Sequence, residues 1–229
     1  TTSDPDGDAV TLTYVWKVNG STVKTTAGST SLTDTLDLSQ SGNGDKGQIV
    51  TVEVTPNDGL LNGSTVNDSA TVQNTAPTVT LAGGNQLNPL EGSTYTYSYS
   101  ISDPDGDTIA SVATSCGTGT KTAPSNTNTS GQFDCKFADG PAGTSVSAQA
   151  SDTGFQAGAG NTATQSITVV NVAPTIAISG ASNVNEGSVY SLTLGAVTDP
   201  GTDTVSSYVV HWGDGQTDTY ASNGVKTHT

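Results

Sequence analysis

Arginine and methionine are absent from this chain of 229 residues, and lysine supplies all six of its basic side chains. Against 21 aspartate and glutamate residues, this leaves a net charge of -15. Binding of phosphates needs clustered basic residues, so the acidic balance argues against nucleic acid as a partner. The acidic balance suits divalent cations, although scattered carboxylates usually only keep a surface hydrated. Because methionine is missing, we expect the chain to be a segment of a longer protein.

Long hydrophobic runs are missing as well. No apolar run is long enough for a membrane helix and no stretch resembles a signal peptide, so we expect no membrane insertion by this segment. Only 32% of the residues are hydrophobic and 5% are aromatic, which favours several thin cores over one thick core. No apolar pattern has the period of a helix, whereas threonine and valine are abundant, so the composition favours strands.

Alternating apolar residues mark the expected strands. In segments 10–18 and 95–101, bulky apolar residues alternate with mostly polar ones. This period of two buries one face of a strand and leaves the other polar. Asn19-Gly20 follows the first segment and predicts a tight hairpin turn. Further strands are expected at 48–55, 64–73, 78–81, 145–150 and 164–170. The sequence therefore predicts an all-β protein.

Three kinds of sequence marker recur at intervals of 95 to 99 residues. They are acidic turns at Asp4, Asp103 and Asp199, Asn-x-Ala-Pro segments ending at Pro77 and Pro174, and Glu-Gly-Ser at Glu91 and Glu186. Their agreement predicts tandem modules of about a hundred residues. The expected modules are 1–76, 77–173 and 174–229. We expect the first to lack its opening strand and the third to lack its last strands, either because a neighbour donates them or because the chain is truncated.

In this order, the markers resemble the tandem immunoglobulin-like repeats of large bacterial surface and secreted proteins. Within that group they are similar to PKD-type and cadherin-like modules. Trp212-Gly213-Asp214-Gly215 resembles the PKD signature Trp-x-x-Gly-Asp-Gly, shortened by two residues, and segment 14–20 looks like the equivalent strand of related repeats. The middle module departs from the pattern because it has cysteines in place of this tryptophan. The resemblance implies tandem immunoglobulin-like Greek-key β-sandwiches, the last of them PKD-like.

The acidic turns place carboxylates at alternate positions, as in Asp103, Asp105 and Asp107. Calcium takes six to eight hard oxygen ligands in flexible geometry, so such a turn is a candidate calcium site. The alternative is a plain turn, because Asp-Pro and Asp-Gly are turn-forming in their own right. The third acidic turn has lost one carboxylate, so we expect it to bind more weakly or not at all.

In cadherin-like repeats, calcium lies between modules and is held by an early glutamate, an acidic loop and the linker. The resemblance therefore adds glutamates of the Glu-Gly-Ser markers and asparagines of the linkers, with Asp58 and Asp152 as further candidates. The alternative makes these glutamates exposed carboxylates beside a turn glycine, and the asparagines turn residues before proline. The predicted ligands of a structural Ca²⁺ are Asp4, Asp6, Asp8, Asn74, Glu91, Asp103, Asp105, Asp107, Asn171 and Glu186.

The two cysteines, Cys116 and Cys135, lie on either side of a polar loop. A disulfide between them would stabilise the fold by roughly 3 kcal/mol through loop entropy, and it implies an oxidising compartment. Two free thiols are the alternative. A zinc site of the cysteine type would need a second pair, which the sequence does not contain.

We expect no enzymatic activity, because the sequence has no Gly-x-Ser-x-Gly nucleophile motif and its repeated acidic residues are more typical of structure than of catalysis. The expected function is an extracellular or cell-surface repeat segment, a calcium-braced stalk or filament element supporting adhesion or assembly. Its partners would be neighbouring modules of the same chain, together with a second copy or an adhesion ligand.

The alternative function is an accessory carbohydrate- or protein-binding module of a secreted hydrolase. Such a module needs an exposed row of aromatic side chains, and the alternation places Tyr95, Tyr97 and Tyr99 on one strand face. Exposure of these three side chains would favour the alternative. Their burial would favour core packing.

Overall fold

The computed structural model describes residues 7–154 and 156–229, and all its regular elements in these ranges are β-strands. The named strand pairs are antiparallel, which confirms the predicted all-β class. The described residues contain no helix with the length and apolar character needed to cross a membrane. The chain divides into two compact units. Unit 1 comprises the described residues up to Thr78, with those of Ser102–Ser111 and Ala150–Asn161, and unit 2 comprises the remainder.

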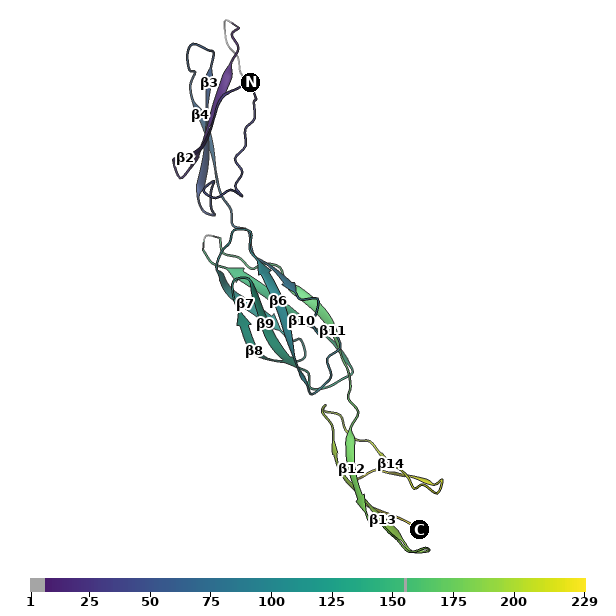
Figure 1. Ribbon diagram of the computed structural model, residues 1–229. Helices are drawn as coiled ribbons and strands as arrows, with labels where there is room; N and C mark the ends of the chain where they lie inside the picture. Colours follow the sequence, from purple (N-terminus) through teal and green to yellow (C-terminus); the bar gives the residue numbers. More distant parts are fainter. Residues whose placement is uncertain (1–6, 155) are drawn as a thin grey trace. The chain divides into compact units, whose positions relative to one another are not determined.

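Unit 1 contains a four-stranded sheet in the order β2-β1-β3-β4 (Figure 1). The strands are β1 (Thr11–Val18), β2 (Ser21–Ser29), β3 (Ile49–Asn57) and β4 (Val66–Thr71). The hairpin between β1 and β2 turns at Asn19 and Gly20, whose φ angles are 47° and 84°. Two successive positive φ angles match the right-handed twist of the strands, and the predicted hairpin turn is confirmed.

The connection from β2 to β3 is anchored to this sheet at both ends. The Tyr14 hydroxyl donates to the Ser31 carbonyl at 2.8 Å, near the start of the connection. Near its end, the Gly47 amide donates to the Val72 carbonyl at 2.8 Å. These backbone and side-chain contacts place Lys46 at one end of the sheet, a position that matters for the acidic cluster described below.

Two further sheets have the strand orders β5-β6-β9-β8 and β11-β10-β7. The strands are β5 (Thr78–Leu81), β6 (Thr94–Ser102), β7 (Ile109–Ser115), β8 (Thr120–Asn126), β9 (Ser130–Lys136), β10 (Ala142–Asp152) and β11 (Ala163–Val169). Buried side chains alternate along β6, β9 and β10, as expected for strands with one face in a core. The segments between these strands, rather than the strands themselves, supply most of the acidic residues of interest.

The aromatic side chains of β6 belong to the core. Tyr97 is fully buried, Tyr99 is 4% exposed, and the Tyr97 ring stacks on Phe133 with 5.9 Å between the ring centroids. Burial raises the pKa of the Tyr97 phenol to about 12. A disulfide joins Cys116, just after β7, to Cys135 on β9, with 5.6 Å between the Cα atoms. The predicted disulfide is therefore present, and the predicted inward direction of the tyrosines holds for Tyr97 and Tyr99.

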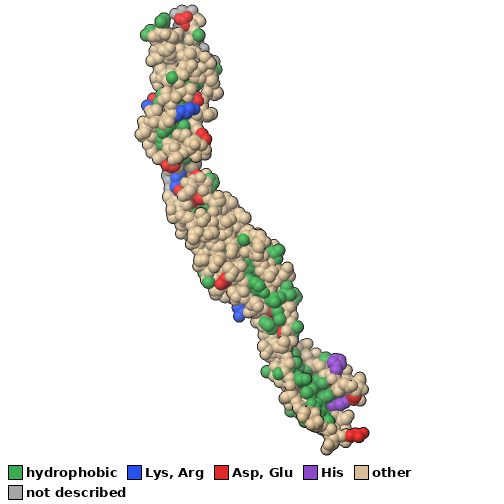
Figure 2. Space-filling model, in the orientation of Figure 1, with side chains coloured by type: hydrophobic (Ala, Val, Ile, Leu, Met, Phe, Trp, Pro, Cys, Tyr) green, Lys and Arg blue, Asp and Glu red, His purple; other side chains and the backbone are tan. Residues whose placement is uncertain are grey.

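The C-terminal part of unit 2 forms the sheet β12-β13-β16 and the hairpin β14-β15. The strands are β12 (Thr175–Gly180), β13 (Tyr190–Thr198), β14 (Tyr208–His211), β15 (Thr217–Tyr220) and β16 (Gly224–His228). Leu194 and Val210 are buried here, but Ile176, Ile178 and Val209 are exposed. Figure 2 shows hydrophobic side chains gathered on this part of the surface. His211 is exposed, as its place in the alternation predicts.

Candidate metal centres

Carboxylates converge in two places among the described residues. Cluster A consists of Asp103, Asp107 and Asp152, all in unit 1. Cluster B consists of Glu91, Asp139 and Asp203, all in unit 2. In each cluster, one carboxylate oxygen from every member lies within 4.8 Å of the others. Oxygen ligands this close together are what a hard divalent cation requires, and like charges at this distance repel one another without one.

Asp103 shapes the acidic turn and also leaves an oxygen without a partner. The turn lies between β6 and β7, where Asp103 Oδ1 accepts hydrogen bonds from the Asp105 amide at 2.9 Å and the Asp107 amide at 3.4 Å. These contacts are the turn chemistry expected of an aspartate. Its other oxygen, Oδ2, is buried and has no hydrogen-bond partner in the part of the chain that the structure describes. Turn formation therefore explains the contacts of Asp103 Oδ1 but not the burial of Oδ2.

Asp152 and Asn74 form the second side of cluster A. Asp152 ends β10, is 3% exposed, and accepts hydrogen bonds from the Gly158 amide at 2.7 Å and from Asn74 Nδ2 at 2.8 Å. The Asn74 hydrogen bond is the main cause that holds the pKa of Asp152 below its ordinary value. Asn74 Oδ1 is a second buried oxygen without a hydrogen-bond partner in the described chain. A buried acceptor left unpaired costs about 1–3 kcal/mol, so these two oxygens are candidates to receive a cation or a water molecule.

Lys46 reaches into the same cluster. Its Nζ contacts Asp107 Oδ2 and donates to the Thr153 carbonyl oxygen. Asp105, the middle aspartate of this acidic turn, accepts a hydrogen bond from the Thr75 amide at 2.6 Å instead. Cluster A thus has the Lys46 ammonium beside its carboxylates.

Glu91 is the centre of cluster B and is fully buried. Its Oε2 accepts a hydrogen bond from the Gly140 amide at 2.7 Å, and its Oε1 accepts one from the Val172 amide at 2.8 Å. A buried carboxylate needs such donors, because removing a charge from water is costly. The interpretation of Glu91 as an exposed surface carboxylate is therefore wrong. Glu186, the glutamate of the second Glu-Gly-Ser marker, is exposed and belongs to neither cluster.

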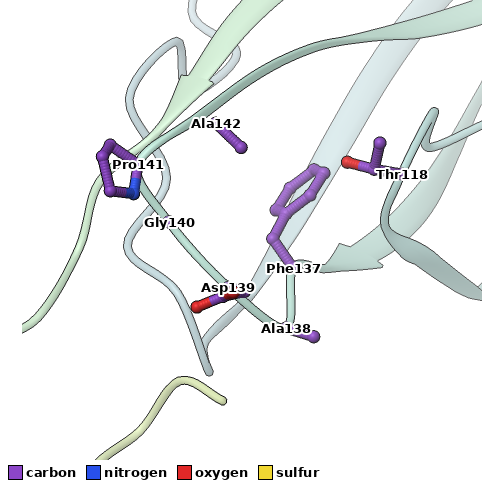
Figure 3. Close-up of a pocket in the computed structure, with 7 residues that line it drawn as sticks. All are labelled: Thr118, Phe137, Ala138, Asp139, Gly140, Pro141 and Ala142. Atoms are coloured by element: carbon purple, nitrogen blue, oxygen red, sulfur yellow. The ribbon is translucent and has the colours of Figure 1, made fainter. Parts of the chain in front are cut away.

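Asp139 and Asp203 complete cluster B from two further loops. Figure 3 shows the segment between β9 and β10, with the Phe137 ring beside Thr118 and the Asp139 carboxylate pointing away from that ring. The turn carrying Asp203 approaches closely because residue 201 is glycine: a Cβ there would lie 2.6 Å from the Glu91 carboxyl carbon. Lost hydration, followed by the charges of Asp139, Glu91 and Asp199, raises the pKa of Asp203.

The side-chain amide of Asn171 faces two acceptors of cluster B, Asp203 Oδ2 and the Gly140 carbonyl oxygen. With its nitrogen toward them, it donates at 2.6 Å and 3.0 Å. With a cation among these oxygens, the amide would turn its own oxygen inward as a ligand.

The structure brings together some of the predicted ligands and separates others. Asn74, Asp103 and Asp107 meet at cluster A, while Glu91 and Asn171 meet at cluster B. Asp4 and Asp6 lie outside the described residues, and Asp8 is exposed and belongs to neither cluster. Asp152 was a further candidate in the sequence, and Asp203 lies in the acidic turn expected to bind weakly. Asp139 and Lys46 carry no motif that could have identified them.

No protein-family model matches the chain, and a comparison with curated proteins gives no significant match. The similarity to PKD-type and cadherin-like modules therefore remains a prediction. The fold and the two clusters define a disulfide-bonded all-β chain with two sets of convergent oxygen ligands.

We expect the two clusters to respond to acid in opposite directions. The pKa of Asp203 is raised on folding, so stability increases as the pH falls through this raised value and the gain is complete below the unfolded value, near 3.9. The pKa of Asp152 is lowered, so its contribution is present above the unfolded value and is lost as the pH falls through the lowered one.

Carboxyl NMR titration of the calcium-free protein measures both values. Asp203→Asn should remove the titration with the raised pKa and leave the titration of Asp152 unchanged. An Asp203 side chain that titrates below Asp152 would contradict the arrangement described for cluster B.

Proposed function

We propose that this chain is a structural segment of an extracellular or cell-surface protein, in which bound calcium braces tandem immunoglobulin-like β-sandwiches of a stalk or filament. Small antiparallel sheets with alternating burial support the sandwich part of the proposal. The disulfide supports an oxidising location. A segment of this kind would support adhesion or assembly without catalysing a reaction.

The observation that carries the proposal is the pair of orphaned oxygens in cluster A. Asp103 belongs to cluster A and Asn74 donates to its member Asp152, and the oxygens Asp103 Oδ2 and Asn74 Oδ1 are both buried. Amide and carboxylate oxygens together are the ligands that calcium prefers, and its irregular coordination tolerates ligands from separate loops. Magnesium requires near-ideal octahedral geometry and keeps more of its water, so calcium suits this set better.

Both clusters draw their oxygens from segments on either side of an expected module boundary. In cluster A, Asn74 precedes residue 76, while Asp103, Asp107 and Asp152 follow it. In cluster B, Glu91 and Asp139 precede residue 173, and Asp203 follows it. A cation held by both sides would restrict their relative movement. It would also stabilise the folded state, by about 2.7 kcal/mol when free calcium is a hundred times the Kd.

The rival function receives less support. An accessory binding module needed an exposed tyrosine row, but Tyr97 and Tyr99 are buried in the core. These two side chains cannot offer a flat platform to a sugar. We therefore do not propose carbohydrate binding on this strand face.

Calorimetric unfolding with calcium, magnesium or chelator tests the proposal. We expect calcium to raise the midpoint more than magnesium does at the same concentration, because only calcium fits the irregular oxygen set. Asp103→Asn combined with Asp107→Asn should remove the part of the shift that cluster A supplies. Asp68→Asn is the matched control, since Asp68 is an exposed residue on β4 in the same unit. An unchanged midpoint at millimolar calcium would rule out the brace.

A further inference from the structure

We propose that Lys46 is a built-in counter-ion of cluster A, which a divalent cation must displace before it binds there. The proposal rests on the proposed function, because it concerns how the same cluster is regulated. Within the described part of the chain, a lysine ammonium lies among the oxygens of cluster A, and no cationic side chain pairs with those of cluster B. The two clusters would therefore load with calcium at different concentrations.

The Lys46 ammonium makes the contacts that a bound cation would make. Its Nζ donates hydrogen bonds to Asp107 Oδ2 and to the backbone carbonyl oxygen of Thr153. A carboxylate and a peptide carbonyl are both typical calcium ligands. The side chains of Lys46 and Asp107 are only 15% and 16% exposed, so this pair lies within the cluster rather than on open surface. The charge of Lys46 is also one of the smaller causes of the lowered pKa of Asp152, after the Asn74 and Gly158 hydrogen bonds.

Lys46 and a metal ion cannot share this position. Both require Asp107 Oδ2, and two positive charges that close repel each other. Lysine is able to leave, because its charge sits on a flexible four-carbon stem. The backbone on either side would stay in place, since Gly47 donates to Val72 and Gln48 donates to Asp45 at 3.0 Å. Displacement would therefore move one side chain and leave the loop in position.

Cluster B provides the contrast within the same chain. Among the described residues, no lysine or histidine forms an ion pair with Glu91, Asp139 or Asp203. Backbone amides donate to Glu91, while lost hydration and then the charges of Asp139, Glu91 and Asp199 raise the pKa of Asp203. A cation entering cluster B relieves repulsion without displacing a resident charge. Cluster B should bind first as calcium rises, and cluster A should follow when Lys46 is displaced.

This arrangement would make the response to calcium graded. When calcium is withdrawn, cluster B loses its only positive charge, whereas cluster A recovers the Lys46 ammonium. The loops of cluster A would then keep a weaker cross-link from Lys46 to Asp107 and Thr153. Lys46 would thus hold the loops of cluster A together at low calcium. The same contact would lower the calcium affinity of cluster A.

The test uses Asp203→Asn to weaken cluster B, so that calcium binding at cluster A can be measured alone. It compares the Asp203→Asn protein with the double variant that also carries Lys46→Gln. Isothermal titration with calcium chloride should show about a fivefold higher affinity after Lys46→Gln, as expected when a competing ion pair is removed. In chelator, the same substitution should lower the unfolding midpoint, because the carboxylates lose their counter-ion. Opposite signs in the two conditions are the signature of a displaced counter-ion.

Lys17→Gln is the matched control. Lys17 pairs with Glu53 at 2.5 Å in the same unit and not with a carboxylate of cluster A, so its removal changes the net charge and breaks one ion pair away from the cluster. Equal calcium affinity in Lys46→Gln and Lys17→Gln would overturn the counter-ion proposal and leave the calcium brace intact. Absence of calcium binding in every variant, including the chain with its natural sequence, would overturn both. Lys46→Arg should keep the low affinity, because it retains the charge.

Discussion

Replacing Glu91 by glutamine should destabilise the folded protein by about 1–3 kcal/mol in chelator, and by more in calcium. The carboxylate accepts one backbone hydrogen bond at each oxygen, from Gly140 and from Val172. Glutamine offers one oxygen and one NH₂ group, so one of these amides would face a donor inside a fully buried site. Relief of repulsion with Asp139 and Asp203 offsets part of this cost in chelator. In calcium, the variant additionally loses a ligand at the centre of cluster B.

Denaturant unfolding in calcium and in chelator measures both effects. Glu186→Gln is the matched control, because Glu186 holds the equivalent position in the second Glu-Gly-Ser marker but is exposed. Its free energy of unfolding should stay within about 0.5 kcal/mol of the natural sequence in both conditions. If Glu91→Gln behaves like Glu186→Gln, Glu91 neither supports the surrounding backbone nor contributes to a cation site.

Removal of the disulfide should cost roughly 3 kcal/mol, from the loop entropy regained by the unfolded chain. Cys116 and Cys135 are separated by 19 residues in the sequence. Cys116→Ala with Cys135→Ala should therefore lower the unfolding midpoint by roughly 6–12 °C for a chain of this size. Both side chains are buried, so the lost sulfur contacts add to the effect.

The comparison is made by calorimetry of the oxidised protein, the reduced protein and the double variant. Reductant should lower the midpoint of the natural sequence and leave that of the double variant unchanged. A natural protein whose unfolding is insensitive to reductant, although its thiols are shown to be free, would contradict a stabilising role for this bond.

Local features of the chain were predictable because their physical causes are local. Alternation along 10–18 and 95–101 predicted β1 and β6, since a period of two can bury only one face of a strand. Asn19-Gly20 predicted the hairpin because both residues readily adopt positive φ angles. The two cysteines on either side of a polar segment predicted the disulfide, since closing a loop of this length stabilises the folded chain.

The candidate clusters were predictable only in part. The spacing of the acidic turn indicated Asp103 and Asp107, and the repeated marker indicated Glu91. The sequence did not indicate that Asp103 would leave one buried oxygen unpaired, or that Glu91 would be buried while Glu186 is exposed. Burial depends on which loops cover a side chain, and repeated motifs carry no information about that.

By itself, the sequence determined the all-β class, several of the strands, the repeat of acidic turns and the disulfide, because each depends on residue type and short-range spacing, whereas β7, β8 and β9 were not predicted. Only the tertiary structure decided which oxygens meet. It brought Asn74 to Asp152, placed Lys46 on Asp107, and joined Asp139 to Glu91 and Asp203. The members of each pair are far apart in the sequence. They meet because loops pack together at the ends of the sheets, and this packing sets the distance between the two side chains.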